Sequence, residues 1–194
     1  MKKSPLRFFL LLALAVSLLG GCAPKVNTTP ELPTGDTLQF GSFLETGNAF
    51  DNLTLREYND ALAADGLYYA TWSLGDAVDY ENEDGDTVPL YDAQLYLIAG
   101  EFTSAEKASD NKNTWLSAAA KNYVDAEQSV LNINGITYDI LTYRCSESSP
   151  YERGISAFAS TKEYAVCAEF TCRDTYTEDL TPTLTAFLET VLYH

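Results

Sequence analysis

The densest group of chemically reactive side chains is a set of six carboxylates within eleven residues, with no basic residue among them: Asp76, Asp79, Glu81, Glu83, Asp84 and Asp86. Carboxylate oxygens suit Ca²⁺. The spacing departs from the EF-hand loop, because aligning Gly85 with the loop glycine puts Tyr80 and Tyr91 at the first and twelfth positions. We therefore expect a solvated hairpin tip and no dedicated metal site. In an acidic, calcium-responsive module the candidate ligands would be Asp79, Glu81, Asp84 and Asp86.

Nucleophilic catalysis has little support in the sequence. The one histidine, His194, is the last residue, where an imidazole lacks the packing that a catalytic base needs. Ser104-Ala105-Glu106-Lys107 and Ser109-Asp110-Asn111 resemble two signatures of serine β-lactamases, but those enzymes bring the two motifs from separate segments. We predict no enzyme activity and no cofactor. The alternative is a carboxylate-dependent envelope glycan hydrolase, which needs two acids about 5–10 Å apart beside aromatic rings.

Aromatic residues are a second source of candidate binding groups. Thirteen tyrosines and two tryptophans are many for 194 residues. Exposed aromatic rings with acidic neighbours can bind sugars or peptides, although most of these rings lie at the alternating or helical spacing of a core. Four remain as candidates for an exposed binding patch: Tyr69, Tyr91, Tyr96 and Tyr151.

A short apolar segment near the start predicts export. Lys2, Lys3 and Arg7 precede twelve uncharged, mostly apolar residues, 8–19, which are too few to span a bilayer. The segment ends in Leu19-Gly20-Gly21-Cys22, which resembles the lipobox of bacterial lipoproteins. That resemblance implies removal of residues 1–21 and a diacylglyceryl thioether on Cys22. The lipid would hold the protein at the extracytoplasmic face of the cell membrane.

The remaining chain divides into a linker and a domain. Residues 22–36, with Pro24, Pro30 and Pro33, predict the lipidated cysteine and a flexible linker, and residues 37–194 predict a single domain. Removing residues 1–21 leaves nine basic and 28 acidic residues, a formal charge of −19. Such a surface repels nucleic acid and anionic lipid. We expect a membrane contact through the lipid on Cys22 and an envelope protein, peptide or glycan as partner.

Three cysteines remain once Cys22 is modified, so at most one disulfide forms within the domain. Cys167 and Cys172 have opposite parity on one expected strand and should point to opposite faces. The candidate pair is therefore Cys145 with Cys172, and an exported protein permits such a bond.

Local patterns predict helices that begin near residue 54 and near residue 115. Thr54-Leu55-Arg56-Glu57 has the form of a capping box, and Leu55, Tyr58 and Leu62 would share one face of the helix that it begins. Residues 103–106 form a second box, which predicts a short helix or turn before a clearer helix over residues 115–123.

Alternating patterns predict three hairpins: residues 67–80 with 88–99, 130–133 with 136–144 across Asn134-Gly135, and 154–160 with 163–172. Thr181-Pro182 predicts the start of a C-terminal helix. Without βαβ alternation, we expect an α+β fold, an antiparallel sheet of hairpins with amphipathic helices packed on it. The last third is loosely similar in topology to PsbP-like domains, without a shared motif. The favoured function is a lipid-anchored, non-enzymatic extracytoplasmic binding domain.

Overall fold

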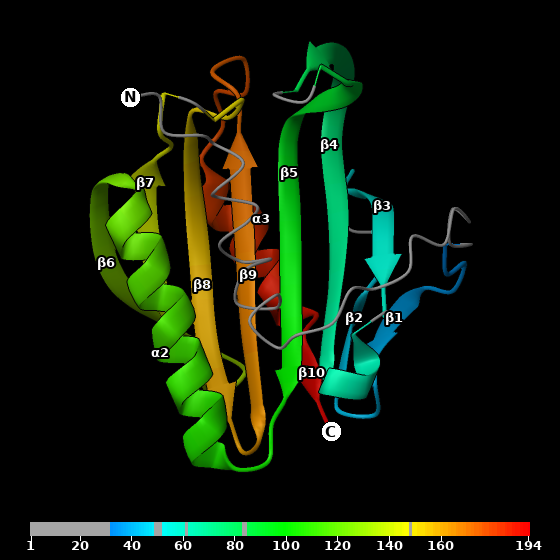
Figure 1. Ribbon diagram of the computed structural model, residues 1–194, viewed down its shortest axis with the longest axis vertical. Coiled ribbons are helices and arrows are strands. Elements are labelled where there is room, and N and C mark those ends of the chain that lie inside the picture. Colours follow the sequence, from blue (N-terminus) through cyan, green and yellow to red (C-terminus); the bar gives the residue numbers. More distant parts are fainter. Residues whose placement is uncertain (1–31, 49–51, 61, 83–84, 148) are drawn as a thin grey trace.

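The computed structural model describes residues 32–48, 52–60, 62–82, 85–147 and 149–194. In chain order the elements are β1 (Thr37–Phe40), β2 (Leu44–Gly47), β3 (Thr54–Asn59), the 3₁₀ turn η1 (Ala63–Asp65), β4 (Leu67–Glu81), β5 (Thr87–Glu101), α2 (Ala105–Asn122), β6 (Val124–Ile133), β7 (Ile136–Arg144), β8 (Arg153–Thr161), β9 (Tyr164–Cys172), α3 (Leu180–Glu189) and β10 (Leu192–Tyr193). The strands form a large antiparallel sheet, β3-β4-β5-β9-β8-β7-β6, and a small one, β1-β2-β10 (Figure 1). This confirms the predicted α+β class.

Both faces of the large sheet are covered. On one face, α3 and the small sheet enclose a core around Trp72, whose ring lies 5.1 Å from that of Phe187 between centroids. On the other face, α2 packs Trp115 and Ala119 against β8 and β9. Figure 1 shows the two helices on opposite sides of the sheet. In strand β8, consecutive residues from Gly154 to Ala159 are therefore all buried, because neither face of the sheet meets water there.

The helix predicted from Thr54 is wrong, because residues 54–59 form edge strand β3. The strand contains a bulge between Leu55 and Glu57, so that Leu55 pairs with Trp72 and Tyr58 with Ala70. Leu55 and Tyr58 therefore pack against the same core although they are three residues apart. An extra residue in a strand thus produces the i, i+3 spacing of a helix.

Two helix boundaries also differ from the prediction. The separate turn and helix expected near residues 103–123 are one continuous helix, α2, whose N-cap is Ser104. The C-terminal helix begins at Leu180 with Asp179 as its N-cap, so Pro182 lies inside its first turn. The sequence analysis does not predict strands β1, β2 and β10, which are short; β1 and β2 form a local hairpin, and β10 pairs with β2 from a distant part of the chain. Among the described residues, no helix is long and apolar enough to cross a membrane.

The three predicted hairpins are confirmed as β4–β5, β6–β7 and β8–β9. At the β6–β7 turn both residues have positive φ, 52° at Asn134 and 79° at Gly135. That combination is the type I′ turn that Asn-Gly favours. The Asn134 side chain also donates to the carbonyl of Glu189 at 3.1 Å, which ties this turn to the end of α3.

A substitution at Gly154 can test how closely β7 and β8 approach each other under α2. It pairs with Tyr143, and a Cβ added at Gly154 would lie 2.6 Å from Cζ of that ring. We expect Gly154→Ala to lower the free energy of unfolding by about 1–3 kcal/mol through overpacking. Gly47→Ala is the control, because its added Cβ would lie 3.5 Å from Thr190, an ordinary contact. Urea unfolding measures both; equal losses would contradict the packing argument.

Candidate functional site

The β4–β5 hairpin extends beyond its neighbours and forms a separate structural feature. Strand β3 pairs with β4 only over residues 69–73, and β9 pairs with β5 only over residues 93–101. Residues 77–81 and 87–91 continue as a two-stranded ribbon, which we call the distal arm (Figure 1). Within the described residues, no third strand pairs with this ribbon.

The base of the distal arm is organised by Asp92. The β4–β5 register shifts between Leu74 and Ala77, and Gly75 has φ of 81° at this point. The Asp92 carboxylate fills the space beside Gly75, where any side chain would collide with it. It also accepts hydrogen bonds from the Asp76 amide at 3.3 Å and the Arg173 guanidinium at 3.4 Å. These contacts fix the arm to the end of β9.

The two faces of the distal arm differ in chemistry. Cross-strand partners share a face, so one face carries Val78, Tyr80, Val88 and Leu90. Val78 is 43% exposed, and the other three side chains are partly buried. The opposite face carries Asp79 and Glu81, both exposed, together with Ala77, Thr87 and Pro89. At its base, Arg56 lies over the Tyr91 ring at 4.6 Å from the centroid. The arm is therefore an amphipathic ribbon.

The candidate metal ligands follow the arm without converging. Asp79 and Glu81 are two positions apart on β4, which spaces them by about 6.4–6.8 Å along the strand. The Asp86 amide donates to the Asn82 side chain at 2.8 Å, and Asp84 lies outside the described residues. Within residues 32–194, apart from the undescribed positions, no group of three or more His, Cys, Asp or Glu could hold a metal ion.

Three of the four candidate aromatic residues are on the β4–β5 hairpin. Tyr69 and Tyr96 are partly buried, with ring centroids 6.0 Å apart, and burial raises the pKa of Tyr69 to about 12. Tyr91 is also partly buried. The exposure expected of Tyr151 is wrong, because only 6% of it is accessible. The Tyr151 hydroxyl lies near the backbone of Tyr91, which places the loop after β7 beside β5.

A partly buried carboxyl group, Glu169, is the feature that sequence reasoning missed. Strand alternation places Glu169 away from the Trp72 core, a position expected to face solvent, but the end of α2 covers it. It accepts hydrogen bonds from the hydroxyls of Tyr123 and, at 3.4 Å, Ser156. The Tyr143 ring is parallel to that of Tyr123, within 3°. Burial raises the Glu169 pKa, while hydrogen bonds from these hydroxyls oppose the shift.

Glu169 and Glu57 belong to one row of residues across the large sheet. They lie in one row across the sheet, Glu57–Thr71–Tyr96–Glu169, with one residue on each of four adjacent strands. Three strand spacings correspond to about 14 Å. The two carboxyls of glycosidases are about 5–10 Å apart.

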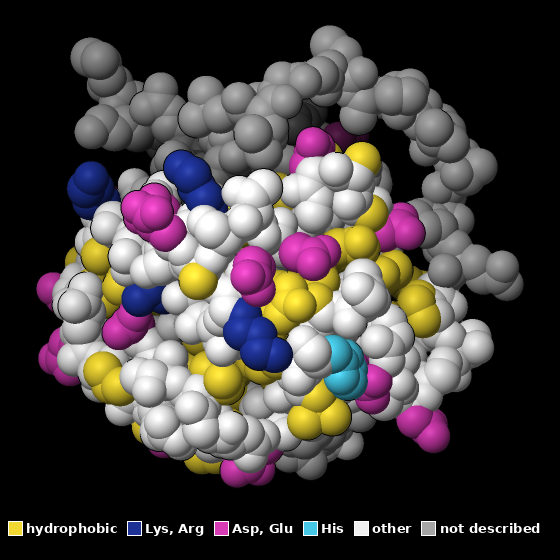
Figure 2. All heavy atoms as spheres, turned by 90° about the horizontal axis from the view of Figure 1, so that it is seen from below, with side chains coloured by type: hydrophobic (Ala, Val, Ile, Leu, Met, Phe, Trp, Pro, Cys, Tyr) yellow, Lys and Arg dark blue, Asp and Glu magenta, His cyan; other side chains and the backbone are white. Residues whose placement is uncertain are grey.

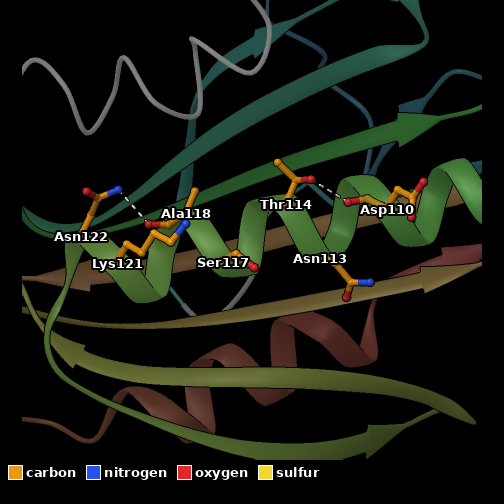
Figure 3. A pocket seen from close by; sticks show the side chains of 7 residues that line it. All are labelled: Asp110, Asn113, Thr114, Ser117, Ala118, Lys121 and Asn122. Atoms are coloured by element: carbon orange, nitrogen blue, oxygen red, sulfur yellow. Dashed lines mark hydrogen bonds between the residues drawn. The ribbon is translucent and has the colours of Figure 1, made fainter.

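Hollows lined by described residues include the following two. One, of about 780 Å³, is lined by residues along one side of α2, and Figure 3 shows their side chains. Thr114 donates to the carbonyl of Asp110, and Asn122 to that of Ala118, so these groups bond within their own helix. The other hollow, about 240 Å³, lies between β6–β8 and the start of α3. Neither contains a candidate residue from the sequence analysis.

The disulfide predicted between Cys145 and Cys172 is not formed in this structure. Cys145, Cys167 and Cys172 are free thiols. The amide of Cys145 donates to Glu152, whose own amide donates to Cys172, so the β8 chain runs between the two cysteines. Two strand spacings are about 10 Å, beyond the reach of a disulfide. Burial also raises the pKa of Cys145 to about 12, which keeps its thiol protonated and unreactive.

The C-terminus is held on the protein surface. The His194 amide donates to the carbonyl of Phe43, and the imidazole Nε2 lies 3.8 Å from Oε2 of Glu45. Figure 2 shows this end of the molecule, with the histidine in cyan and acidic, basic and hydrophobic side chains interspersed around it. His194 thus contacts a carboxylate at an exposed position.

No protein-family model matches this chain, and no curated protein matches it in sequence. A crystal structure from Bacteroides thetaiotaomicron VPI-5482 is similar to it with 11% identity and a TM-score of 0.36, over 65% of this chain and 45% of the other. The chain thus spans less than half of that protein. The solution structure of cyanobacterial PsbP (CyanoP) from Synechocystis sp. PCC 6803 matches with 14% identity and a TM-score of 0.39, over 76% and 96%. A PsbP-like domain is therefore among the distant structural neighbours, and this similarity assigns no functional residue.

The raised pKa of Glu169 predicts how the free energy of unfolding depends on pH. Because its folded-state pKa is raised above the usual 4.5, the folded protein binds this proton more tightly than the unfolded chain does. The resulting stabilisation is present at low pH and is lost as the pH rises through the raised pKa. Glu169→Gln removes the titration, so we expect its free energy of unfolding to increase relative to wild type as the pH rises through that window.

Urea unfolding at a series of pH values measures this difference. Glu147→Gln, the same substitution at an exposed position, is the matched control. An equal slope in the control, or no slope for Glu169→Gln, would show that burial of Glu169 does not control the titration.

Proposed function

We propose that this chain is a lipid-anchored, extracytoplasmic binding domain without catalytic activity, which contacts an envelope protein, peptide or glycan through the distal arm. The distal arm itself carries this proposal. It extends past the neighbouring strands and combines two exposed carboxylates with a partly exposed apolar face. Apolar side chains gathered on an accessible surface beside charged groups are typical of interaction sites.

The attachment of residues 33–35 supports the proposed anchor. The Asn48 side-chain amide donates to the carbonyls of Pro33 at 2.9 Å and Gly35 at 2.7 Å. The backbone carbonyl of Asn48 accepts from the indole of the buried Trp72 at 2.8 Å. The chain is therefore attached to the folded domain from Pro33 onward, and Pro33 lies eleven residues after Cys22.

An eleven-residue tether suits a strongly acidic domain. Fully extended, it reaches about 36–40 Å. That reach exceeds the Debye length of about 8 Å at physiological salt, so repulsion from anionic lipid is screened. The lipid on Cys22 would then supply the membrane contact, and the acidic surface would remain in water.

Mass spectrometry of the full chain from a bacterial host tests the anchor. We expect loss of residues 1–21 and a diacylglyceryl group on Cys22, with the protein in the membrane fraction. Cys22→Ser should move it to the soluble fraction, because the acyl chains provide the membrane affinity. Cys145→Ser, a thiol loss inside the domain, is the control and should stay membrane-bound. An intact Met1 or a free thiol at Cys22 would refute the anchor.

A further inference from the structure

We propose that the outer edge of β4 in the distal arm, residues 77–81, adds an extended partner segment as a further strand, and that this segment alternates lysine or arginine with apolar residues. The inference rests on the proposed function and names the class of its partner. It follows from the hydrogen-bond ladder of the arm, from the difference between its two edges and from its charge.

The ladder determines which backbone groups point outward. The Asn82 amide donates to the Asp86 carbonyl at 2.9 Å, so these residues face each other across the ribbon. Antiparallel pairs alternate between bonded and non-bonded, which makes Tyr80–Val88 and Val78–Leu90 the bonded pairs. The residues between them direct their amides and carbonyls away from the ribbon: Ala77, Asp79 and Glu81 on β4, and Thr87 and Pro89 on β5.

The β5 edge is obstructed. Pro89 has no amide to donate. Immediately below, the carbonyl of Asp92 accepts from the Arg173 amide at 2.9 Å. A further strand would meet missing or occupied groups along this edge.

The β4 edge is open. Strand β3 stops pairing with β4 at Ser73, and the described residues provide no strand partner for Ala77, Asp79 or Glu81. Each of these three residues has both an amide and a carbonyl to offer. The open edge therefore matches the backbone of an extended peptide, as in other strand-addition complexes.

The side chains beside this edge define the sequence of the partner. A strand added to β4 would place alternate side chains next to Asp79 and Glu81 on one face, and next to Val78 and Tyr80 on the other. Opposite charges on neighbouring strands stabilise pairing, so the first set should be lysine or arginine. The second set should be apolar, because it can cover Val78, which is 43% exposed.

A second copy of this chain is a poor occupant of the same edge. Antiparallel pairing of two β4 edges would put Asp79 and Glu81 of both copies on one face. Like charges on neighbouring strands destabilise pairing, and charged residues at sheet edges oppose self-association. The charge of the arm therefore favours a basic partner over a homodimer.

Fluorescence anisotropy tests the proposal on the full chain in uncharged detergent. The probe is a labelled octapeptide of alternating lysine and valine. We expect saturable binding that weakens about fivefold when Asp79→Asn and Glu81→Gln are combined, as two exposed ion pairs would predict. Glu106→Gln with Asp110→Asn removes the same charge from exposed positions on α2 and is the matched control, which should bind as wild type.

Two further measurements decide what kind of contact is made. The same octapeptide with alternate backbone amides methylated keeps its charge but cannot pair fully, and equal binding of it would overturn strand addition. Equal weakening in the α2 control would remove the arm as the site. Self-association without peptide, seen by sedimentation, would replace the basic partner with a second copy. Acylation of Cys22, measured on the same preparation, reports on the anchor independently of all three outcomes.

Discussion

The pairing of β4 with β5 is the interaction on which the rest of this structure depends. Its lower half lies in the large sheet and contributes Trp72, Leu95 and Leu97 to the main core. Its upper half extends past β3 and β9 as the distal arm. A buried lower half can hold an exposed upper half in place, because the two share continuous strands. An isolated two-stranded ribbon would be only marginally stable in water.

The covering of both sheet faces produces the second unusual feature, the partly buried carboxyl group of Glu169. A sheet with one solvated face would leave Glu169 exposed, and α2 removes that solvent. The carboxyl group is retained inside the protein because hydroxyls of Tyr123 and Ser156 donate to it. A buried polar group without such partners would be strongly destabilising. The protein thus keeps its buried acid on the α2 side and its solvated acids on the arm.

Several features could be predicted from the sequence because their causes are local. Asn134-Gly135 specifies its turn through the positive φ of both residues, and the alternation of residues 67–80 specifies a strand whichever neighbour it pairs with. The capping box expected at residues 103–106 likewise falls at the start of α2, although Ser104 and not Thr103 is the cap. The helix predicted at Leu55 and Tyr58 is wrong for a physical reason. Pairing with β4 creates a bulge, and the bulge places two core residues three positions apart, which is the spacing of a helix.

The sequence by itself determined the acidic charge, the hairpins and the acids of the β4–β5 tip, since these depend only on residue type and short-range spacing. Only the tertiary structure decided which strand edges remain open, that Arg173 occupies the base of the β5 edge, and that Tyr123 at the end of α2 partly covers Glu169. It also decided that β8 runs between Cys145 and Cys172. Each of these depends on which distant segments become neighbours, and packing of the whole chain determines that choice.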